Sequence, residues 1–332
     1  MASSRSRLGL LLPNQGVVFG AITVREILEL AVAADESGVF DSLFVGDNLL
    51  AKPRLESVTT LSALAAKTNR VRLGTACMAS FPLRNPILLA AQWSALDNLA
   101  EGRTVLVACI GGGGGGGIGG EFDNEFRAFG ILPKERAARL EEGIEILRTL
   151  WTNDPATHHG RFFNFDNIAV RPPPVHKPCP PIWIANNPHI FGARPDIVRR
   201  TVERVGRLAD GWMTTQASPE QFSRSWAEIR ESAARNGRNP DSLESSLYYN
   251  INMNDNREEA FSESKRFLDQ YYSADFTVED IDRWTAYGAP ATCAEKIREF
   301  ADAGVQTMII RFTSYSQMAQ LQRFIEEVVP LL

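Results

Sequence analysis

The sequence predicts a closed α/β barrel of eight parallel strands, the (β/α)8 or TIM-barrel class, and three observations indicate it. Short apolar runs alternate with longer amphipathic runs along the whole 332-residue chain. The alternation repeats eight times, which favours a closed barrel over an open doubly wound sheet. The first run is followed by LLPNQG, not by the G-x-G-x-x-G of a dinucleotide-binding fold. We therefore expect a single domain over residues 1–332.

The predicted strands are short runs rich in aliphatic and aromatic residues, as is typical of parallel strands buried on both faces. Polar or glycine-containing segments bound each run. In chain order the predicted strands are Leu8–Pro13, Asp41–Gly46, Arg70–Met78, Arg103–Cys109, Pro181–Ala185, Gly211–Thr215, Ser246–Met253 and Thr307–Phe312.

The segments between the strands carry helical spacing and helix-capping residues. The first, from about Val24 to Ser37, has Thr23 and Glu26 at capping-box spacing and Gly38 at its end. The same reasoning predicts helices over roughly Glu56–Lys67, from Asn85 and Pro86 onward, over Pro133–Trp151, from Pro195, over Pro219–Arg235, after an Asp255–Glu258 capping box, after Thr292 and Glu295, and to about Val329.

Two excursions and a glycine tract depart from this alternation. The excursions follow the fourth and seventh strands and cover Thr152–Pro180, with GRFFNF as a short strand, and Tyr271–Tyr287. Seven consecutive glycines, Gly111–Gly117, carry a large entropic penalty for ordering. Three interpretations stay open: a substrate lid, a disordered connector, which we favour, or an engineered stretch or one standing in for unidentified residues.

Composition narrows the class of protein further. The net charge of -5 and the pI near 5.6 argue against a nucleic-acid partner or an anionic membrane surface. There is no run of about 18 apolar residues, so no membrane-spanning helix is expected. The 4 cysteines form no C-x-x-C pair, and the histidines show no metal-binding spacing. We expect a cytoplasmic protein without a metal site or a disulfide framework.

Several segments in a fixed order resemble the luciferase-like monooxygenase family. They are FDSLFVGDN, TNRVRLGTACMASFPLRNP, LDNLAEGRTVLV, ERAARLEEGIEILRTLW, GRFFNF, PPIWIANN, RLADGWMT and GAPATCAEKIREFADAGVQTMIIRF. Each is a weak signal alone, but the ordered set is specific and covers nearly the whole chain. The resemblance implies a flavin that lies across the carboxyl ends of the barrel strands.

The function that the resemblance favours is FMNH2-dependent monooxygenation of a small organic substrate with O2. The reduced FMN would come from a separate flavin reductase, and the protein would be a homodimer or homotetramer. A sister branch of the family uses a deazaflavin coenzyme for hydride transfer, which makes a deazaflavin-dependent reductase or dehydrogenase the first alternative. A non-catalytic flavin-binding protein is the second alternative, because a fold does not fix a function.

Three residues at the predicted strand ends are candidates for catalysis. Asp47 can act as an acid or orient another group. Asn48 stands where many relatives carry histidine, and an amide cannot titrate near neutral pH, which weakens any mechanism of alcohol oxidation that needs that base. Arg311 ends the last strand, where a buried charge is costly unless it is used. It would bind substrate or a cofactor oxygen, or else form an internal ion pair.

The flavin implied by the resemblance has candidate contacts at four strand ends. We expect a non-proline cis peptide or a bulge near Cys77–Met78. Arg84 would contact a phosphate or anion, or fix its loop by a salt bridge. Trp212 would pack beneath the cofactor or in the core. The full candidate set is Gly46, Cys77, Met78, Ala79, Arg84, Ala185, Asn186, Asn187, Gly211 and Trp212.

Overall fold

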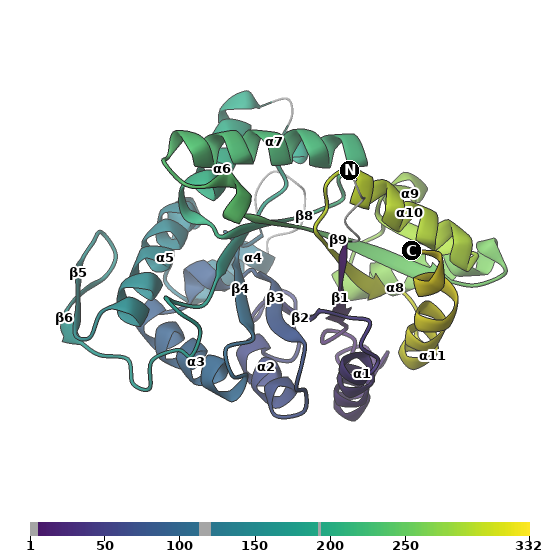
Figure 1. The fold of residues 1–332 in the computed structure, drawn as a ribbon, viewed down its shortest axis with the longest axis horizontal. Helices are drawn as coiled ribbons and strands as arrows, with labels where there is room; N and C mark the ends of the chain where they lie inside the picture. The colour runs from purple at the N-terminus through teal and green to yellow at the C-terminus, as the bar shows by residue number, and fades with distance from the viewer. Residues whose placement is uncertain (1–5, 113–120, 192–193) are drawn as a thin grey trace.

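A computed structural model describes residues 6–112, 121–191 and 194–332, and it contains a closed barrel of eight parallel strands ringed by helices (Figure 1). Of the Gly111–Gly117 tract, only Gly111 and Gly112 belong to the described residues. The barrel closes because the last strand, β11, pairs in parallel with the first, β1. In order around the barrel, the strands are β1 (Arg7–Leu12), β2 (Ser42–Asp47), β3 (Arg72–Met78), β4 (Thr104–Ala108), β7 (Ile182–Ala185), β8 (Gly211–Thr215), β9 (Glu244–Met253) and β11 (Thr307–Phe312).

The helices form the outer layer and cover the apolar outer face of the barrel. Thr23 and Glu26 form the expected capping box at the start of α1. The α-helices are α1 (Val24–Glu36), α2 (Ser57–Ala65), α3 (Pro86–Leu99), α4 (Glu121–Ala128), α5 (Arg136–Thr152), α6 (Pro195–Leu208), α7 (Pro219–Arg235), α8 (Arg257–Tyr272), α9 (Val278–Trp284), α10 (Pro290–Asp302) and α11 (Gln317–Arg323).

Two of the predicted helix caps are wrong. Asn256, not Asp255, caps α8, since its side chain accepts the backbone N–H groups of residues 258 and 259. Asp255 instead pairs with Arg323. The helix α10 begins at Pro290, so Thr292 and Glu295 lie inside it and Ala289 is the cap. Local spacing suggested both boxes, but the chain enters each helix at a different residue.

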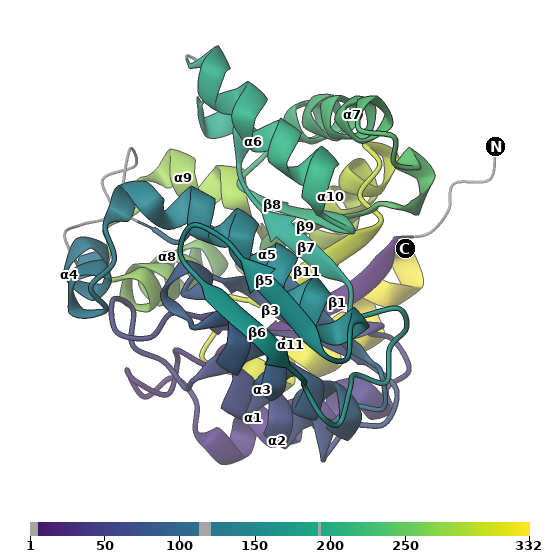
Figure 2. The same cartoon turned by 90° about the vertical axis from the view of Figure 1, so that its left-hand side faces the viewer.

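Both predicted excursions contain additional structure. The first contains the antiparallel hairpin of β5 (Ala156–His159) and β6 (Asn164–Ile168), which packs against α5 outside the barrel (Figure 2). Only the last two residues of GRFFNF belong to β6. The second contains α9 and β10 (Thr285–Gly288), which extends the sheet by pairing in parallel with the end of β9. Figure 2 shows α4, α8 and α9 at the end of the barrel away from the N-terminus.

Inside the barrel, the strands approach closely at two glycines. A Cβ at Gly74 would lie 2.7 Å from the side chain and from the carbonyl oxygen of Val105, and a Cβ at Gly9 would lie 2.8 Å from Ser42 Oγ. The absence of a side chain at these positions lets the Phe44 ring fill the interior. Among the residues described, no helix is both long and apolar enough to cross a membrane.

Candidate active site

The carboxyl ends of the barrel strands form one face, which we call the mouth, and the third strand has an irregular end there. The expected non-proline cis peptide lies between Ala76 and Cys77. The pairing of β3 with both neighbouring strands changes register over the same stretch. In barrels of this class, residues at this face carry the chemistry.

Asp47 lies at the end of β2 and is fully engaged by hydrogen bonds. Its Oδ1 accepts Ser57 Oγ at 2.6 Å and Arg84 Nη2 at 2.7 Å. Its Oδ2 accepts the backbone N–H of Ser80 at 2.9 Å and Ser80 Oγ at 2.6 Å. The carboxylate therefore fixes the loop after β3 to the end of β2, and it presents no unused oxygen to a substrate.

Arg84 completes this arrangement, which we call the Asp47 cluster (Asp47, Glu56, Ser57, Ser80 and Arg84). Its guanidinium also contacts Glu56 Oε1 at 2.8 Å. Burial lowers the pKa of Arg84, but the neighbouring carboxylates of Asp47 and Glu56 more than offset this and raise it. The structure thus places Arg84 in the loop-fixing salt bridge, the alternative to phosphate binding.

Asn48 faces a second arginine that the sequence did not single out. Arg54 Nη2 donates to Asn48 Oδ1 at 3.1 Å and to Gln15 Oε1 at 2.7 Å. The guanidinium covers Gly46 so closely that a Cβ there would lie 2.2 Å from Arg54 Nη1. Asn48 Nδ2 is buried and has no partner among the described residues. An unused amide donor therefore lies at the end of β2.

Arg311 lies inside the barrel mouth, fully buried, within a cage of aromatic rings. Its Cζ is 4.2 Å from the Tyr271 ring centroid, 5.0 Å from Tyr248, 5.1 Å from Tyr272 and 5.6 Å from Trp284. Burial lowers the pKa of Arg311, whereas the tyrosine side chains outweigh burial and raise it. Among the described residues, no carboxylate pairs with it. The internal ion pair, one of the two sequence-based interpretations, is therefore not present in the described part of the chain.

Arg311 has a polar neighbour in Asn250 of β9, which pairs with it in register. Arg311 Nε donates to Asn250 Oδ1 at 3.1 Å, and Nη1 donates to Tyr272 Oη at 3.3 Å. Arg311 Nη2 and Asn250 Nδ2 are buried and lack partners among the residues described. We call Arg311, Asn250 and the four rings the Arg311 cage. The ring of Tyr271 joins it to Arg54, whose Cζ lies 5.7 Å from the ring centroid.

The predicted cofactor contacts at the end of β3 and directly after it lie at the mouth. Cys77 is partly exposed, and its Sγ donates to Cys109 Sγ at 2.8 Å. Met78 is fully buried. The carbonyl oxygen of Ala79 approaches Gly111, where a Cβ would lie 2.7 Å from it. Cys77 and Ala79 are therefore the residues of this group that remain accessible at the mouth.

The predicted contacts at the fifth and sixth strands separate into two groups. Ala185 ends β7 at the mouth, and Asn186 and Asn187 follow it. Asn186 Oδ1 accepts Trp212 Nε1 at 2.9 Å, and Asn187 Oδ1 accepts Thr214 Oγ1 at 2.9 Å. These acceptors join β7 to β8. Gly211, however, begins β8 and so lies at the opposite end of the barrel.

Trp212 is a core residue in the structure. It is fully buried and packs against Phe222 and Trp226 of α7, with ring centroids 5.0 Å and 6.2 Å away. Strand residues alternate between the two faces of a sheet, and this one points outward to the helices. Neither Gly211 nor Trp212 therefore reaches the mouth, because one lies at the wrong strand end and the other on the wrong face.

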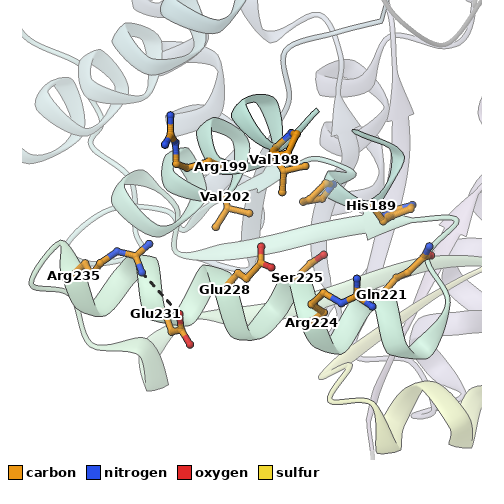
Figure 3. Close-up of a pocket in the computed structure, with 12 residues that line it drawn as sticks. His189, Val198, Arg199, Val202, Gln221, Arg224, Ser225, Glu228, Glu231 and Arg235 are labelled. Atoms are coloured by element: carbon orange, nitrogen blue, oxygen red, sulfur yellow. Dashed lines mark ion pairs between the residues drawn. The ribbon is translucent and has the colours of Figure 1, made fainter. Parts of the chain in front are cut away.

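A pocket of about 580 Å³ lies outside the barrel, between α6 and α7 (Figure 3). Val198 and Arg199 of α6 and Gln221 and Glu228 of α7 line it, together with His189. Burial and the nearby Arg283 guanidinium lower the pKa of His189 to about 4, so the imidazole is neutral at physiological pH. The pocket faces the helix layer and contains none of the mouth residues. In the described part of the chain, no three metal-ligating side chains cluster.

Comparison with known proteins identifies relatives over most of the chain. A family model described as luciferase-like monooxygenase matches residues 6–277. The chain is 27% identical to an F420-dependent glucose-6-phosphate dehydrogenase from Nakamurella multipartita, over 92% of each chain. It is 26% identical to the enzyme of that description from Nocardia farcinica, over 93% of this chain and 94% of the other. F420 is a deazaflavin coenzyme.

Solved structures share the same fold. An F420-dependent secondary alcohol dehydrogenase superposes with a TM-score of 0.80 at 18% identity, covering 99% of both chains. A monooxygenase from Streptomyces bottropensis superposes with a TM-score of 0.79 at 22% identity, covering 98% of this chain and 99% of the other. At these identities the likeness supports the barrel and leaves the choice of cofactor and substrate to the residues of the mouth.

Proposed function

Because the chain belongs to the luciferase-like monooxygenase family of flavin- or deazaflavin-dependent oxidoreductases, we propose that it is an F420-dependent reductase of small carbonyl compounds. The hydride would pass from the reduced coenzyme to an electron-poor carbon of the substrate, and a proton would go to the substrate oxygen. Curated relatives described as F420-dependent support the coenzyme. The residues of the mouth support the direction of transfer.

The observation that carries the proposal is an excess of hydrogen-bond donors at the mouth. Arg311 Nη2, Asn250 Nδ2 and Asn48 Nδ2 are all buried without partners among the described residues. An unpaired buried donor costs free energy, so these groups favour a ligand that supplies acceptors. A substrate oxygen that gains negative charge as hydride arrives is such an acceptor, and a buried guanidinium is suited to stabilise it.

Among the described residues that end the barrel strands, few can act as a base. Asn48 cannot titrate, the oxygens of Asp47 are occupied by four hydrogen bonds, and Arg311 stays charged. Tyr248 keeps its proton because burial raises its pKa. Its hydroxyl lies 3.2 Å from that of Tyr272, which in turn accepts from Arg311. Oxidation of an alcohol needs a base to take the hydroxyl proton, whereas reduction needs donors, which this mouth contains.

The residues present fit the deazaflavin ring system. Gly46 has no side chain, and Arg54 lies against it where a Cβ would stand. The amide donor of Asn48 is free to meet a ring carbonyl oxygen. When bound, the coenzyme supplies the hydride. Asn48, Cys77 and Ala79 would hold the ring beside Arg54, which covers Gly46, and the loop after β7, with Asn187, would hold the polar tail.

Anaerobic titration tests the coenzyme. We expect tight binding of oxidised and reduced F420, measured by absorbance and fluorescence, and weaker binding of FMN and FMNH2. Reduced F420 should then be consumed with an aldehyde, ketone or conjugated carbonyl compound from a substrate panel. Preferential binding of FMNH2 would contradict the proposal.

The second candidate is FMNH2-dependent monooxygenation, with a separate reductase as partner. The description of the matching family model favours it. Admitting air to the complex with FMNH2 separates the two functions, since a monooxygenase would form a transient peroxyflavin absorbance and consume O2. A reductase of the proposed kind would show neither.

A further inference from the structure

Two thiols meet at the mouth on neighbouring strands. Cys77 belongs to the end of β3, and Cys109 directly follows β4. Their sulfur atoms are 2.8 Å apart. The backbone N–H of Cys109 donates to the carbonyl oxygen of Met78 at 3.4 Å, so the sheet itself holds the two residues side by side. Small side-chain rotations would bring the sulfurs to the length of a disulfide, about 2.05 Å.

The other two cysteines provide an internal comparison. Cys293 is fully buried in the core on α10, and burial raises its pKa to about 12. Cys179 is half-buried in the segment before β7. In the described residues neither of them contacts another thiol. Cys77 and Cys109 are both partly exposed, so a small oxidant can reach the pair that is already in contact.

We propose that Cys77 and Cys109 are a redox-active dithiol, which a hydroperoxide oxidises to a reversible disulfide joining the ends of β3 and β4. In the first step, one thiolate attacks the peroxide, the O–O bond breaks, and a sulfenic acid and an alcohol or water form. In the second step, the other thiol displaces water from the sulfenic acid, and the S–S bond forms. The two thiols lose two electrons and two protons, and the hydroperoxide is reduced by the same two electrons.

The contacts of the pair assign a role to each sulfur. Cys77 donates its S–H to Cys109 Sγ, so the proton of Cys77 is already held in a hydrogen bond. That hydrogen bond, together with burial, raises the pKa of Cys77 well above its ordinary value. The Arg136 guanidinium lies near this segment, since its Nη1 donates to the carbonyl oxygen of Gly112, three residues after Cys109, at 2.9 Å. Cys109 is therefore the attacking thiol and Cys77 the resolving thiol.

Oxidation would alter the mouth where the ring of the coenzyme is expected, and this consequence alone rests on the proposed function. Cys77 adjoins Met78 and Ala79, so a bond to Cys109 restrains the strand end that would face the cofactor. We expect the disulfide form to bind F420 about tenfold more weakly than the dithiol form. If the reduced protein fails to bind F420, the proposed function fails. Formation of the disulfide is measured separately, by mass spectrometry, and does not depend on that result.

The test uses the full chain, reduced and then treated with hydrogen peroxide. Intact mass should fall by two hydrogen atoms, the number of titratable thiols should fall by two, and a reductant should restore both. Peptide mapping should find the Cys77–Cys109 link. A Cys179→Ser, Cys293→Ser double variant is the matched control and should give the same loss. Oxygen addition without a cross-link, an unchanged mass, or a link involving another cysteine would overturn the proposal.

Single substitutions test the order of attack. In Cys77→Ser, a sulfenic acid should persist at Cys109 and be trapped by a dione reagent. In Cys109→Ser, Cys77 should react at least tenfold more slowly. Thermal melting of both variants verifies that they fold, and labelling of Cys77 that is as fast as that of Cys109 would refute the assigned roles.

Discussion

Arg84 and Arg311 both bury a guanidinium at the mouth of the barrel, yet their surroundings are opposite. Arg84 contacts two carboxylates, those of Asp47 and Glu56, and its neighbours use every oxygen of Asp47. Arg311 has aromatic rings and an amide around it and, in the described residues, no carboxylate. The charge of Arg84 is neutralised and its cluster has no free hydrogen-bond acceptor on Asp47, so this cluster stabilises the fold. The charge of Arg311 is not neutralised by a described carboxylate, so this residue can still bind an anion.

The comparison predicts that a substitution in the Asp47 cluster mainly lowers the free energy of unfolding. Asp47→Ala removes the buried partner of Arg84 and leaves a charge with only the half-exposed Glu56. Breaking a buried pair in this way costs about 3–5 kcal/mol, so urea unfolding should show a loss of that size. Ser57→Ala, which removes one neutral hydrogen bond to the same carboxylate, is the control and should cost about 1 kcal/mol. An Asp47→Ala protein as stable as the parent would show that this cluster is not structural.

A substitution in the Arg311 cage should mainly lower kcat/KM and leave the stability of the fold unchanged. Arg311→Met keeps the volume of the side chain and its contacts with the rings but removes the charge, and we expect kcat/KM for the best carbonyl substrate to fall about 100- to 1000-fold. Stability should be unchanged or higher, because an unpaired buried charge is replaced by an apolar group. Equal losses of stability and activity would place Arg311 among the residues that only support the fold.

The fold was largely predictable, and the contacts of the site were not. The bounds predicted for all eight barrel strands agree with the structure to within two residues, because a strand buried on both faces is a continuous apolar run. Asp47, Asn48 and Arg311 follow from strand ends alone. Their partners Arg54, Tyr271 and Tyr272 come from a loop and from the end of α8, whose approach depends on tertiary packing. The one available signal was the aromatic pair at the start of the second excursion.

The face of a strand residue was a separate difficulty. In a run such as GWMTT every side chain is apolar or small, so period-two alternation gives no sign of which residues point into the barrel. The sequence therefore leaves Trp212 among the candidate cofactor contacts, although in the structure its ring stacks on α7. For Arg84 the sequence allows both anion binding and a salt bridge, since it does not show which carboxylate reaches the guanidinium.

A single substitution should give Arg311 a carboxylate partner like those of Arg84. Asn250→Asp places a carboxylate where Asn250 Oδ1 already accepts from Arg311 Nε at 3.1 Å. The new ion pair neutralises the cation, so we expect kcat/KM to fall about 10- to 100-fold while the thermal midpoint stays the same or rises. Asn250→Gln, which keeps a neutral amide, should lose less activity. Full activity in Asn250→Asp would mean that the charge of Arg311 does not act on the substrate.

The smallest expected effect concerns Glu56, the outer partner of Arg84. Burial raises the pKa of Glu56, but the Thr59 backbone N–H and Arg84 outweigh burial and lower it from the ordinary value of 4.5. A carboxylate whose folded-state pKa is lowered stabilises the fold above its unfolded-state pKa, and this contribution is lost as the pH falls through the folded-state value. Glu56→Gln should therefore reduce stability by about 1 kcal/mol or less at pH 7, since the group is partly exposed, and by progressively less below pH 4.5. Urea unfolding of parent and variant across this range measures the difference, and a gap that widens with acid would contradict the assigned ion pair.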